Sequence, residues 1–193
     1  SSKSGAADLL EALGIKIDLT GSEVEQTVHK IGIGFCFAPI FHSSMKHAAV
    51  ARKELGTPTI FNILGPLANP AKAIACAIGV ARAELLPLMS QVLLEQGKEG
   101  FVFRGDDGLD EVSLSTTTQV IQINDGKLTQ SEFNPADLGI TSSSISDLVG
   151  GDAKYNADMT MKIFTGVKGP MRDAVTLNAA FAIAAFKADF NLP

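Results

Sequence analysis

The sequence predicts an α/β fold in which a mixed, mostly parallel sheet is flanked by helices. Uninterrupted apolar runs such as IACAIGV and GFVF are typical of strands buried on both faces. Stretches with helical periodicity alternate with these runs, which is the pattern of a parallel sheet covered by helices. The run QVIQINDGKLTQSEF instead places two strand patterns around an Asp-Gly turn, so an antiparallel hairpin should make the sheet mixed.

The expected elements follow one another closely along the chain. Apolar spacing and terminating glycines predict helices at residues 8–13, 43–55 and 83–96, and Ser22 is a fair N-cap for another that ends near Gly32. Two more helices are expected at the end of the chain, at residues 153–165 and 170–188, the second with Pro170 in its first turn. Short buried strands are expected at 31–40, 73–80 and 100–105, and the hairpin at 116–133. Residues 57–70 contain three prolines and a glycine and should form a loop-rich connection.

Composition sets limits on the class of protein. The 193 residues are 46% hydrophobic and 19% charged, which suits one globular domain covering residues 1–193. The formal net charge of −5 disfavours a broad nucleic-acid interface. Cys36 and Cys76 each sit in an apolar run and are expected to be small core residues in a reducing cytoplasm. No apolar stretch is long enough to span a bilayer, so no membrane partner is expected.

The stretch GDDGLDEVS, residues 105–113, carries four acids directly after the predicted strand FVFRG. Ligands bind beyond the carboxyl ends of strands in parallel α/β sheets, and clustered carboxylates repel one another unless a cation or water screens them. Adjacent Asp110 and Glu111 suit a magnesium ion whose remaining ligands come from phosphates and water. Asp and Gly also favour hydrated turns, so the pattern alone leaves both interpretations open.

Other polar stretches are equally ambiguous when each is taken alone. Arg52 lies in a basic helical stretch, where it is either a bidentate carboxylate ligand or part of a solvated face. The segment SSKSG precedes a helix, where free N–H groups bind an anion or the serines simply cap. Asn178 lies among apolar residues of the last helix and requires hydrogen-bond partners. No Ser/His/Asp arrangement for nucleophilic catalysis is evident.

Several stretches taken together resemble the anthranilate phosphoribosyltransferase family. They are SSKSGAADLLEALG, GIGFCFAP, HAAVARKELGTPTIFNILGPLANP, GDDGLDEVS and GPMRDAVTLNAA, in family order and with family-like gaps over essentially the whole chain. The resemblance implies a catalytic domain of the nucleoside phosphorylase/phosphoribosyltransferase type. It also implies transfer of the phosphoribosyl group of phosphoribosyl pyrophosphate (PRPP) to the amine of anthranilate, in tryptophan biosynthesis.

The resemblance also implies roles for particular residues. Asp110 and Glu111 match the family's magnesium-binding pair, so Mg²⁺ is the expected cofactor. Arg52 matches the arginine that contacts the anthranilate carboxylate. Ser1 and Ser2 match serines that hold PRPP, and Ala6 stands where many members have a serine on that ligand. Asp106 and Asp107 receive no role.

The chain departs from the family pattern in ways that limit these expectations. Arg104 stands where many members have a histidine, and the N-terminal helical domain, the glycine-rich pyrophosphate loop and the Lys-His-Gly-Asn-Arg segment are missing. The chain therefore looks like a fragment that is inactive alone and that forms a cytoplasmic homodimer when full length. The alternatives are a pyrimidine nucleoside phosphorylase and a non-catalytic nucleic-acid-binding relative.

Overall fold

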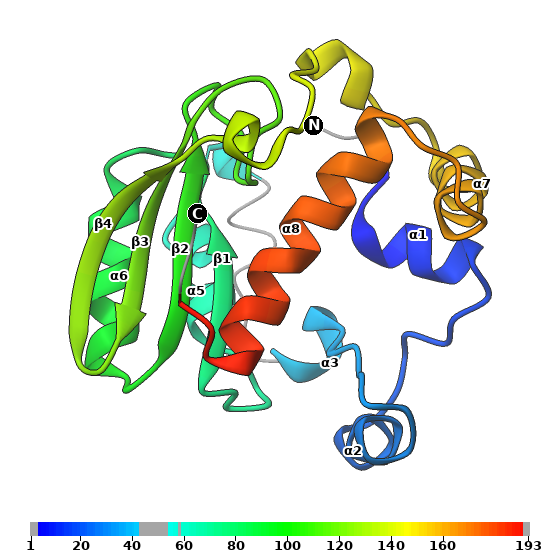
Figure 1. The fold of residues 1–193 in the computed structure, drawn as a ribbon. Coiled ribbons are helices and arrows are strands. Elements are labelled where there is room, and N and C mark those ends of the chain that lie inside the picture. The colour runs from blue at the N-terminus through cyan, green and yellow to red at the C-terminus, as the bar shows by residue number, and fades with distance from the viewer. Residues whose placement is uncertain (1–3, 43–53, 58, 191–193) are drawn as a thin grey trace. The chain divides into compact units, whose positions relative to one another are not determined.

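The computed structural model describes residues 4–42, 54–57 and 59–190 (Figure 1). Contacts between residues group the chain into two compact units. The first unit comprises Ser1–Lys72 and Gly150–Met161, and the second comprises Ala73–Val149 and Lys162–Pro193. Within the described ranges, no helix has the length and apolar character needed to cross a membrane.

The first unit contains short helices. They are α1 (Ala6–Ala12), α2 (Gly21–Ile31), α3 (Ala38–Phe41) and α5 (Phe61–Leu67), together with most of α7 (Ala153–Phe164). Helix α2 begins earlier than predicted because Thr20, not Ser22, is its N-cap: the Thr20 N–H donates to Glu23 Oε2 at 2.7 Å, and Thr20 Oγ1 accepts the Glu23 N–H. The predicted end is confirmed, since Gly32 adopts the left-handed conformation with φ of 81°.

The strand predicted at residues 31–40 is wrong. Residues 33–37 belong to neither a helix nor a strand, and Ala38–Phe41 form α3, which has Pro39 in its first turn. This stretch packs on a helix, because a Cβ at Gly34 would lie 2.8 Å from a side-chain carbon of Val24 in α2 and 2.9 Å from one of Val28. An apolar run of this length is ambiguous, and here contact with a helix replaces pairing with a strand.

The loop predicted at residues 57–70 is also wrong in its middle, which forms α5. Pro66 lies one residue before the helix ends, so α5 loses only the one backbone hydrogen bond that this N–H would have made. The Asn62 side chain accepts the N–H of Thr59 at 3.1 Å just before the helix. Of the helix predicted at residues 43–55, only Glu54 and Leu55 are described, and both are helical.

The second unit is built on a four-stranded sheet in the order β1-β2-β3-β4. The strands are β1 (Ala75–Gly79), β2 (Glu99–Gly105), β3 (Thr118–Asn124) and β4 (Lys127–Phe133). β1 and β2 pair in parallel, whereas β2–β3 and β3–β4 are antiparallel. The mixed sheet is therefore confirmed, but antiparallel pairing takes a larger share of the described sheet than expected.

The predicted hairpin is confirmed, and its turn has the expected chemistry. Asp125 and Gly126 connect β3 to β4 with positive φ values of 49° and 69°. Two consecutive positive φ angles characterise the two-residue turn that matches the twist of a hairpin, and Asp-Gly is a favoured sequence for it.

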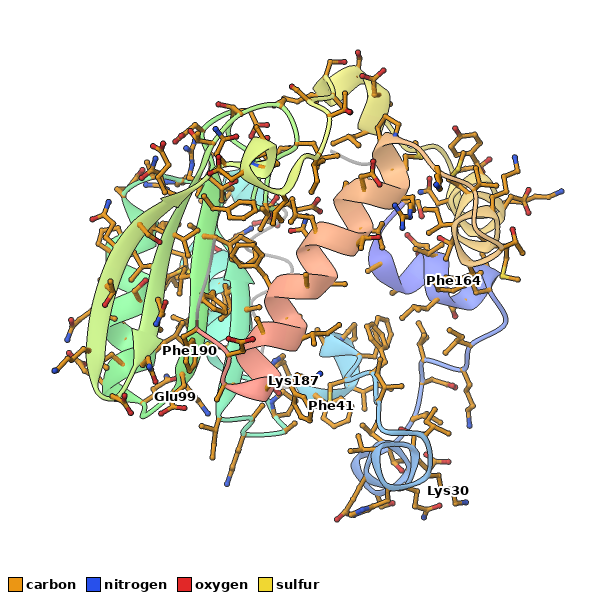
Figure 2. All side chains as sticks on the ribbon, in the orientation of Figure 1. Lys30, Phe41, Glu99, Phe164, Lys187 and Phe190 are labelled. Carbon is orange, nitrogen blue, oxygen red and sulfur yellow. The ribbon has the colours of Figure 1, made fainter. Side chains whose placement is uncertain are left out.

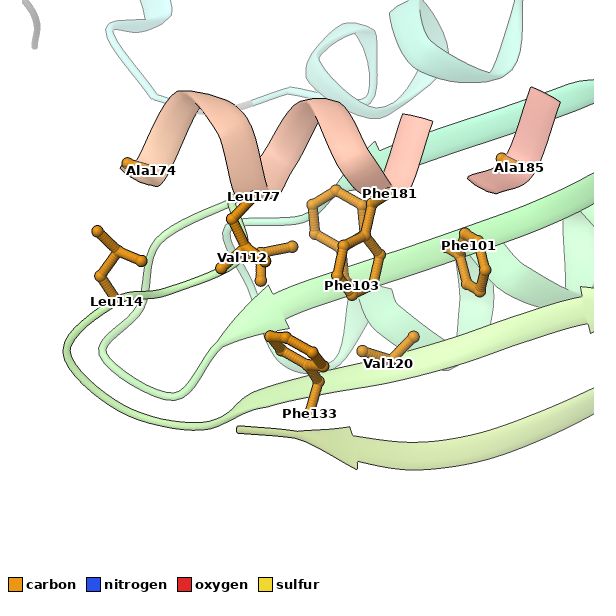
Figure 3. Packing of buried hydrophobic residues seen from close by; sticks show 10 residues of the cluster. All are labelled: Phe101, Phe103, Val112, Leu114, Val120, Phe133, Ala174, Leu177, Phe181 and Ala185. Carbon is orange, nitrogen blue, oxygen red and sulfur yellow. The ribbon is translucent and has the colours of Figure 1, made fainter. Parts of the chain in front are cut away.

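Helices cover both faces of this sheet. Helix α6 (Leu85–Glu95) lies behind the sheet and α8 (Pro170–Lys187) in front of it (Figure 1), as the sequence predicted. The apolar core under α8 is organised by Phe181, whose ring lies 5.4 Å from those of Phe101 and Phe103 and 5.3 Å from that of Phe133 (Figure 3). Truncating such a ring to alanine typically costs about 3–5 kcal/mol, so burial fixes α8 on the sheet.

Two further features complete this unit. Short 3₁₀ helices at Pro135–Leu138 and Ile145–Leu148 lie between β4 and α7. Beyond α8, the ring of Phe190 lies 5.6 Å from that of Phe101, and side chains fill the space between helix and sheet (Figure 2).

The cysteines are free and half-buried. The Cys76 thiol donates to the backbone oxygen of Glu99 at 3.3 Å, and burial raises its pKa to about 11. Cys76 therefore stays protonated at neutral pH, as expected of a small packing residue rather than a reactive thiol.

Candidate functional site

The acidic segment lies beside an open cleft of about 440 Å³ at the carboxyl ends of β1 and β2. Gly79 is the last residue of β1, and Phe103 is its partner in β2. The cleft is lined by Ala77, Gly79, Phe103, Asp110, Glu111, Ala174, Val175, Asn178 and Ala182. The prediction that the acids follow the end of a parallel strand is therefore confirmed, and two of the four acids reach the cleft.

Asp107 holds the acidic segment in shape. Its Oδ1 accepts the N–H of Leu109 at 3.1 Å, and its Oδ2 accepts the hydroxyls of Ser113 at 2.5 Å and Ser115 at 2.6 Å. Partial burial acts to raise the pKa of Asp107, but these hydrogen bonds outweigh it and the pKa is lowered. The carboxylate stays ionised at neutral pH and is used for the loop's own structure.

Two neighbouring residues also have structural contacts. Asp106 Oδ2 accepts the hydroxyl of Thr117 and the side-chain amide of Gln119, the latter at 3.2 Å. Arg104 Nε donates to the backbone oxygen of Ala81 at 3.3 Å, which ties the end of β2 to the segment after β1. Neither Asp106 nor Arg104 lines the cleft.

Gly79 lets the backbone of Asp110 cross directly over the end of β1. A Cβ at Gly79 would lie 1.7 Å from the carbonyl oxygen of Asp110 and 2.5 Å from its carbonyl carbon. No side chain fits at those distances, so the place of Asp110 in the cleft depends on a glycine at this position.

Asn178 of α8 fastens the other side of the same segment. Its Oδ1 accepts the N–H of Val112 at 2.8 Å, and its Nδ2 donates to the Val112 oxygen at 3.1 Å and to the Ala174 oxygen at 3.0 Å. Asn178 therefore has the hydrogen-bond partners that were expected for it from the sequence. Asp110 and Glu111 are thus held between a glycine of β1 and an asparagine of α8.

The electrostatics of the pair favour a cation. The pKa of Glu111 is raised, first because the surrounding protein desolvates its carboxyl and second because of the Asp110 charge. The residue keeps solvent contact, so water screens this repulsion in part. A cation in the cleft would favour the ionised form of Glu111 and offset the repulsion.

The donor set fits Mg²⁺ with help from a ligand. Within the described ranges, no three His, Cys, Asp or Glu side chains gather as a metal cluster. Asp110 and Glu111 are the two acidic residues that line the cleft. Magnesium is commonly held by one or two carboxylates and completed by substrate phosphates and water, so the residues present suit that arrangement.

The remaining predicted site residues are Ser1, Ser2, Arg52 and Ala6. Ser1, Ser2 and Arg52 lie outside the described residues. Ala6 is the first residue of α1 in the other unit, and it is exposed.

Sequence reasoning missed Gly79 and did not connect Asn178 to the acids. A glycine inside a strand pattern is a signal of close backbone approach and would have drawn attention to Gly79. The contact between Asn178 and Val112 spans 66 residues of sequence and has no local signature.

The fold and the cleft define a class: an α/β domain with a carboxylate pair at its strand ends, suited to a metal–phosphate ligand. The chain belongs to the family described as "Glycosyl transferase family, a/b domain", whose model matches residues 1–191. It is 52% identical to an anthranilate phosphoribosyltransferase from Rhodococcus jostii, over 97% of this chain and 52% of the relative. The corresponding enzyme from Arthrobacter sp. is 48% identical over 98% of this chain and 54% of the relative.

Solved structures of the same kind resemble the chain closely. Anthranilate phosphoribosyltransferase from Thermus thermophilus matches with a TM-score of 0.89 and 37% identity, covering 97% of this chain and 56% of that one. The Saccharomyces cerevisiae enzyme in complex with PRPP and Mg matches with a TM-score of 0.87 and 30% identity, covering 96% and 54%. The chain thus spans about half the length of the relatives it matches.

Proposed function

We propose that the protein to which this chain corresponds transfers the phosphoribosyl group of PRPP to anthranilate, giving N-(5-phosphoribosyl)-anthranilate and pyrophosphate. One observation carries the proposal: 52% identity over 97% of the chain to an enzyme named for this reaction. The Asp110–Glu111 pair in a cleft at the strand ends supports it independently. The family model runs through both compact units, which supports treating residues 1–193 as one partial catalytic domain.

In this proposal, Asp110 and Glu111 are the residues that would hold Mg²⁺ when PRPP binds. When bound, the ion supplies positive charge to the departing pyrophosphate. The yeast relative has been solved in complex with PRPP and Mg, which supports the cofactor assignment. Ser1, Ser2 and the α1 start at Ala6 are assigned to the PRPP side on the family resemblance.

The chain's own residues contribute positioning and electrostatics. Breaking the bond between ribose C1 and pyrophosphate leaves positive charge on the ribose ring while the anthranilate amine attacks the same carbon. The paired carboxylates would hold the metal ion that binds the leaving group, and Arg52 would orient the nucleophile through the carboxylate of anthranilate. An aromatic amine is a usable nucleophile without a strong base, which agrees with the absence of a catalytic triad pattern in the sequence. The homodimeric state and the cytoplasmic location expected from the resemblance belong to the same proposal.

The test uses two proteins: the chain alone, and a chimaera that adds the part of the Rhodococcus jostii relative that this chain does not cover. Anthranilate fluorescence is followed with and without PRPP and Mg²⁺. The chimaera should consume anthranilate only when both are present, and the chain alone should not. A chimaera that folds but instead cleaves thymidine with phosphate would establish the phosphorylase alternative and overturn the proposal.

Arg52 provides a specific prediction about substrate recognition. In the chimaera, Arg52→Ala should raise the KM for anthranilate at least about tenfold, because a bidentate charge-assisted contact contributes roughly 1.5–3 kcal/mol. The KM for PRPP should change little. Lys53→Ala removes a positive charge from the adjacent position and serves as the control. Equal effects of Arg52→Ala on both KM values would argue against the carboxylate contact.

A further inference from the structure

We propose that Asn178 is a positioning residue that fixes the Asp110–Glu111 pair in the geometry needed for metal binding. The inference rests on the proposed function, since it takes these two carboxylates as the Mg²⁺ ligands. It concerns a residue of another element, on the helix that faces the cleft, that does not itself need to touch the metal.

The hydrogen bonds of Asn178 define one orientation of its amide. The Val112 N–H is a donor, so it requires the oxygen Oδ1, at 2.8 Å. The nitrogen Nδ2 then faces two acceptors, the oxygens of Val112 at 3.1 Å and Ala174 at 3.0 Å. Both backbone groups of Val112 are thereby occupied by one side chain, immediately after Glu111 in the sequence.

A comparison of energies indicates that helix α8 holds the acidic segment, rather than the reverse. Helix α8 is anchored by Leu177 and Phe181, which are 4% and 3% exposed, and burial of this kind is worth several kcal/mol. Each neutral hydrogen bond of Asn178 contributes only about 1 kcal/mol net. The helix therefore does not depend on Asn178 for its position, and it is the acidic segment that the amide holds in place.

Other contacts hold residues 110–112 in place together with the hydrogen bonds of Asn178. The Val112 side chain is 2% exposed and belongs to the core under α8 (Figure 3). The Asp110 carbonyl rests against Gly79. With its backbone fixed on both sides, the segment presents its two carboxylates to the cleft without first losing conformational entropy when a cation binds.

The chain contains a matched control for this interaction. Asn156 in α7 makes the same pair of bonds to Gly151: its Oδ1 accepts the Gly151 N–H at 2.9 Å, and its Nδ2 donates to the Gly151 oxygen at 3.2 Å. Like Asn178 it is half-buried, but the backbone to which it bonds is not part of the acidic segment. Replacing Asn156 by leucine removes an equivalent pair of side-chain to backbone hydrogen bonds elsewhere in the chain.

The experiment compares wild type, Asn178→Leu and Asn156→Leu as full 193-residue chains. Mn²⁺ replaces Mg²⁺ as the probe, because its free fraction is read directly by electron paramagnetic resonance. Loss of an outer-shell partner typically weakens metal binding about tenfold to hundredfold, so the Kd of Asn178→Leu for Mn²⁺ should rise by that factor. The Kd of Asn156→Leu should equal that of wild type.

Two further readouts separate positioning from general stability. Amide hydrogen exchange without metal should accelerate in the peptide that contains Val112 only when Asn178 is replaced. In the chimaera, Asn178→Leu should raise the Mg²⁺ concentration needed for half-maximal rate, and saturating Mg²⁺ should restore most of kcat. If Asn178→Leu does not fold, Asn178→Ser keeps a polar group there and is measured instead.

The outcomes are distinguishable. A folded Asn178 variant that binds Mn²⁺ as tightly as wild type, or no more weakly than Asn156→Leu, overturns the inference and leaves the proposed function intact. If the wild-type chain and the chimaera both bind no Mn²⁺ in the cleft, with or without pyrophosphate, the metal assignment of Asp110 and Glu111 is overturned and the inference fails with it.

Discussion

Replacing Glu111 by glutamine is expected to abolish the effect of Mg²⁺ on activity and on thermal stability while leaving the fold intact. In the chimaera, kcat/KM should fall at least about a hundredfold, since a metal ligand that stabilises the leaving group is worth several kcal/mol. The metal-free chain should become slightly more stable at neutral pH, by less than about 1 kcal/mol, because the screened repulsion from Asp110 disappears. Activity and thermal unfolding with and without Mg²⁺ measure the two effects.

The same prediction has a defined pH dependence. The pKa of Glu111 is higher in the folded chain than in an ordinary glutamate, so the fold favours its protonated form. Its unfavourable contribution to stability is therefore present above the folded pKa and disappears as the pH falls through it. Mg²⁺ requires the ionised carboxylate, so the rise in Tm caused by Mg²⁺ should shrink as the pH falls toward the raised pKa of Glu111.

Asp106→Asn is the matched control for Glu111→Gln. It removes one negative charge from the same loop, but Asp106 bonds Thr117 and Gln119 and does not line the cleft. Its Mg²⁺ response should match that of wild type. An equal loss of response in Asp106→Asn would mean that loop charge in general, rather than the Asp110–Glu111 pair, attracts the ion.

Adding a single methyl group at Gly79 is expected to disrupt both the strand end and the site. In Gly79→Ala, the new Cβ would lie 1.7 Å from the carbonyl oxygen of Asp110, so backbone must move. Overpacking of this kind typically costs about 1–3 kcal/mol, and here it displaces Asp110 as well. Urea unfolding should show the loss of stability, and the Mn²⁺ titration should show weaker binding.

Gly65→Ala controls for the general effect of replacing glycine. A Cβ at Gly65 meets no atom within 4 Å, and the residue lies inside helix α5, where alanine is favoured. Its free energy of unfolding should stay the same or rise slightly. Wild-type stability and metal binding in Gly79→Ala would show that Asp110 does not depend on the close approach to β1.

The parts of the fold that sequence predicted are those whose signals are local. The Asp-Gly turn specifies the β3–β4 hairpin, and the long apolar periodicity before Gly97 specifies α6. The failures came where an apolar run had two physical solutions. Residues 33–37 pack Gly34 against α2 instead of pairing as a strand, and α5 forms despite Gly65 and Pro66, the proline removing one hydrogen bond near the end of the helix.

The candidate site also has parts that were predictable from sequence and parts that were not. Asp110 and Glu111 were predictable because the acids directly follow a recognisable strand, and strand ends are where such folds bind ligands. Their support was not predictable, because Asn178 reaches Val112 across 66 residues. The division between Asp107, whose carboxylate bonds its own loop, and the two acids in the cleft likewise requires three-dimensional contacts.

The two outer strands of the described sheet differ in the charge that they carry. β4 is largely exposed and carries Lys127 and Glu132, and charged side chains on an edge discourage another strand from pairing there. β1 reads ACAIG, without a charge to oppose such pairing. Among the described residues, charge therefore opposes further strand pairing at the β4 edge and not at the β1 edge, and β1 is also the strand that borders the cleft.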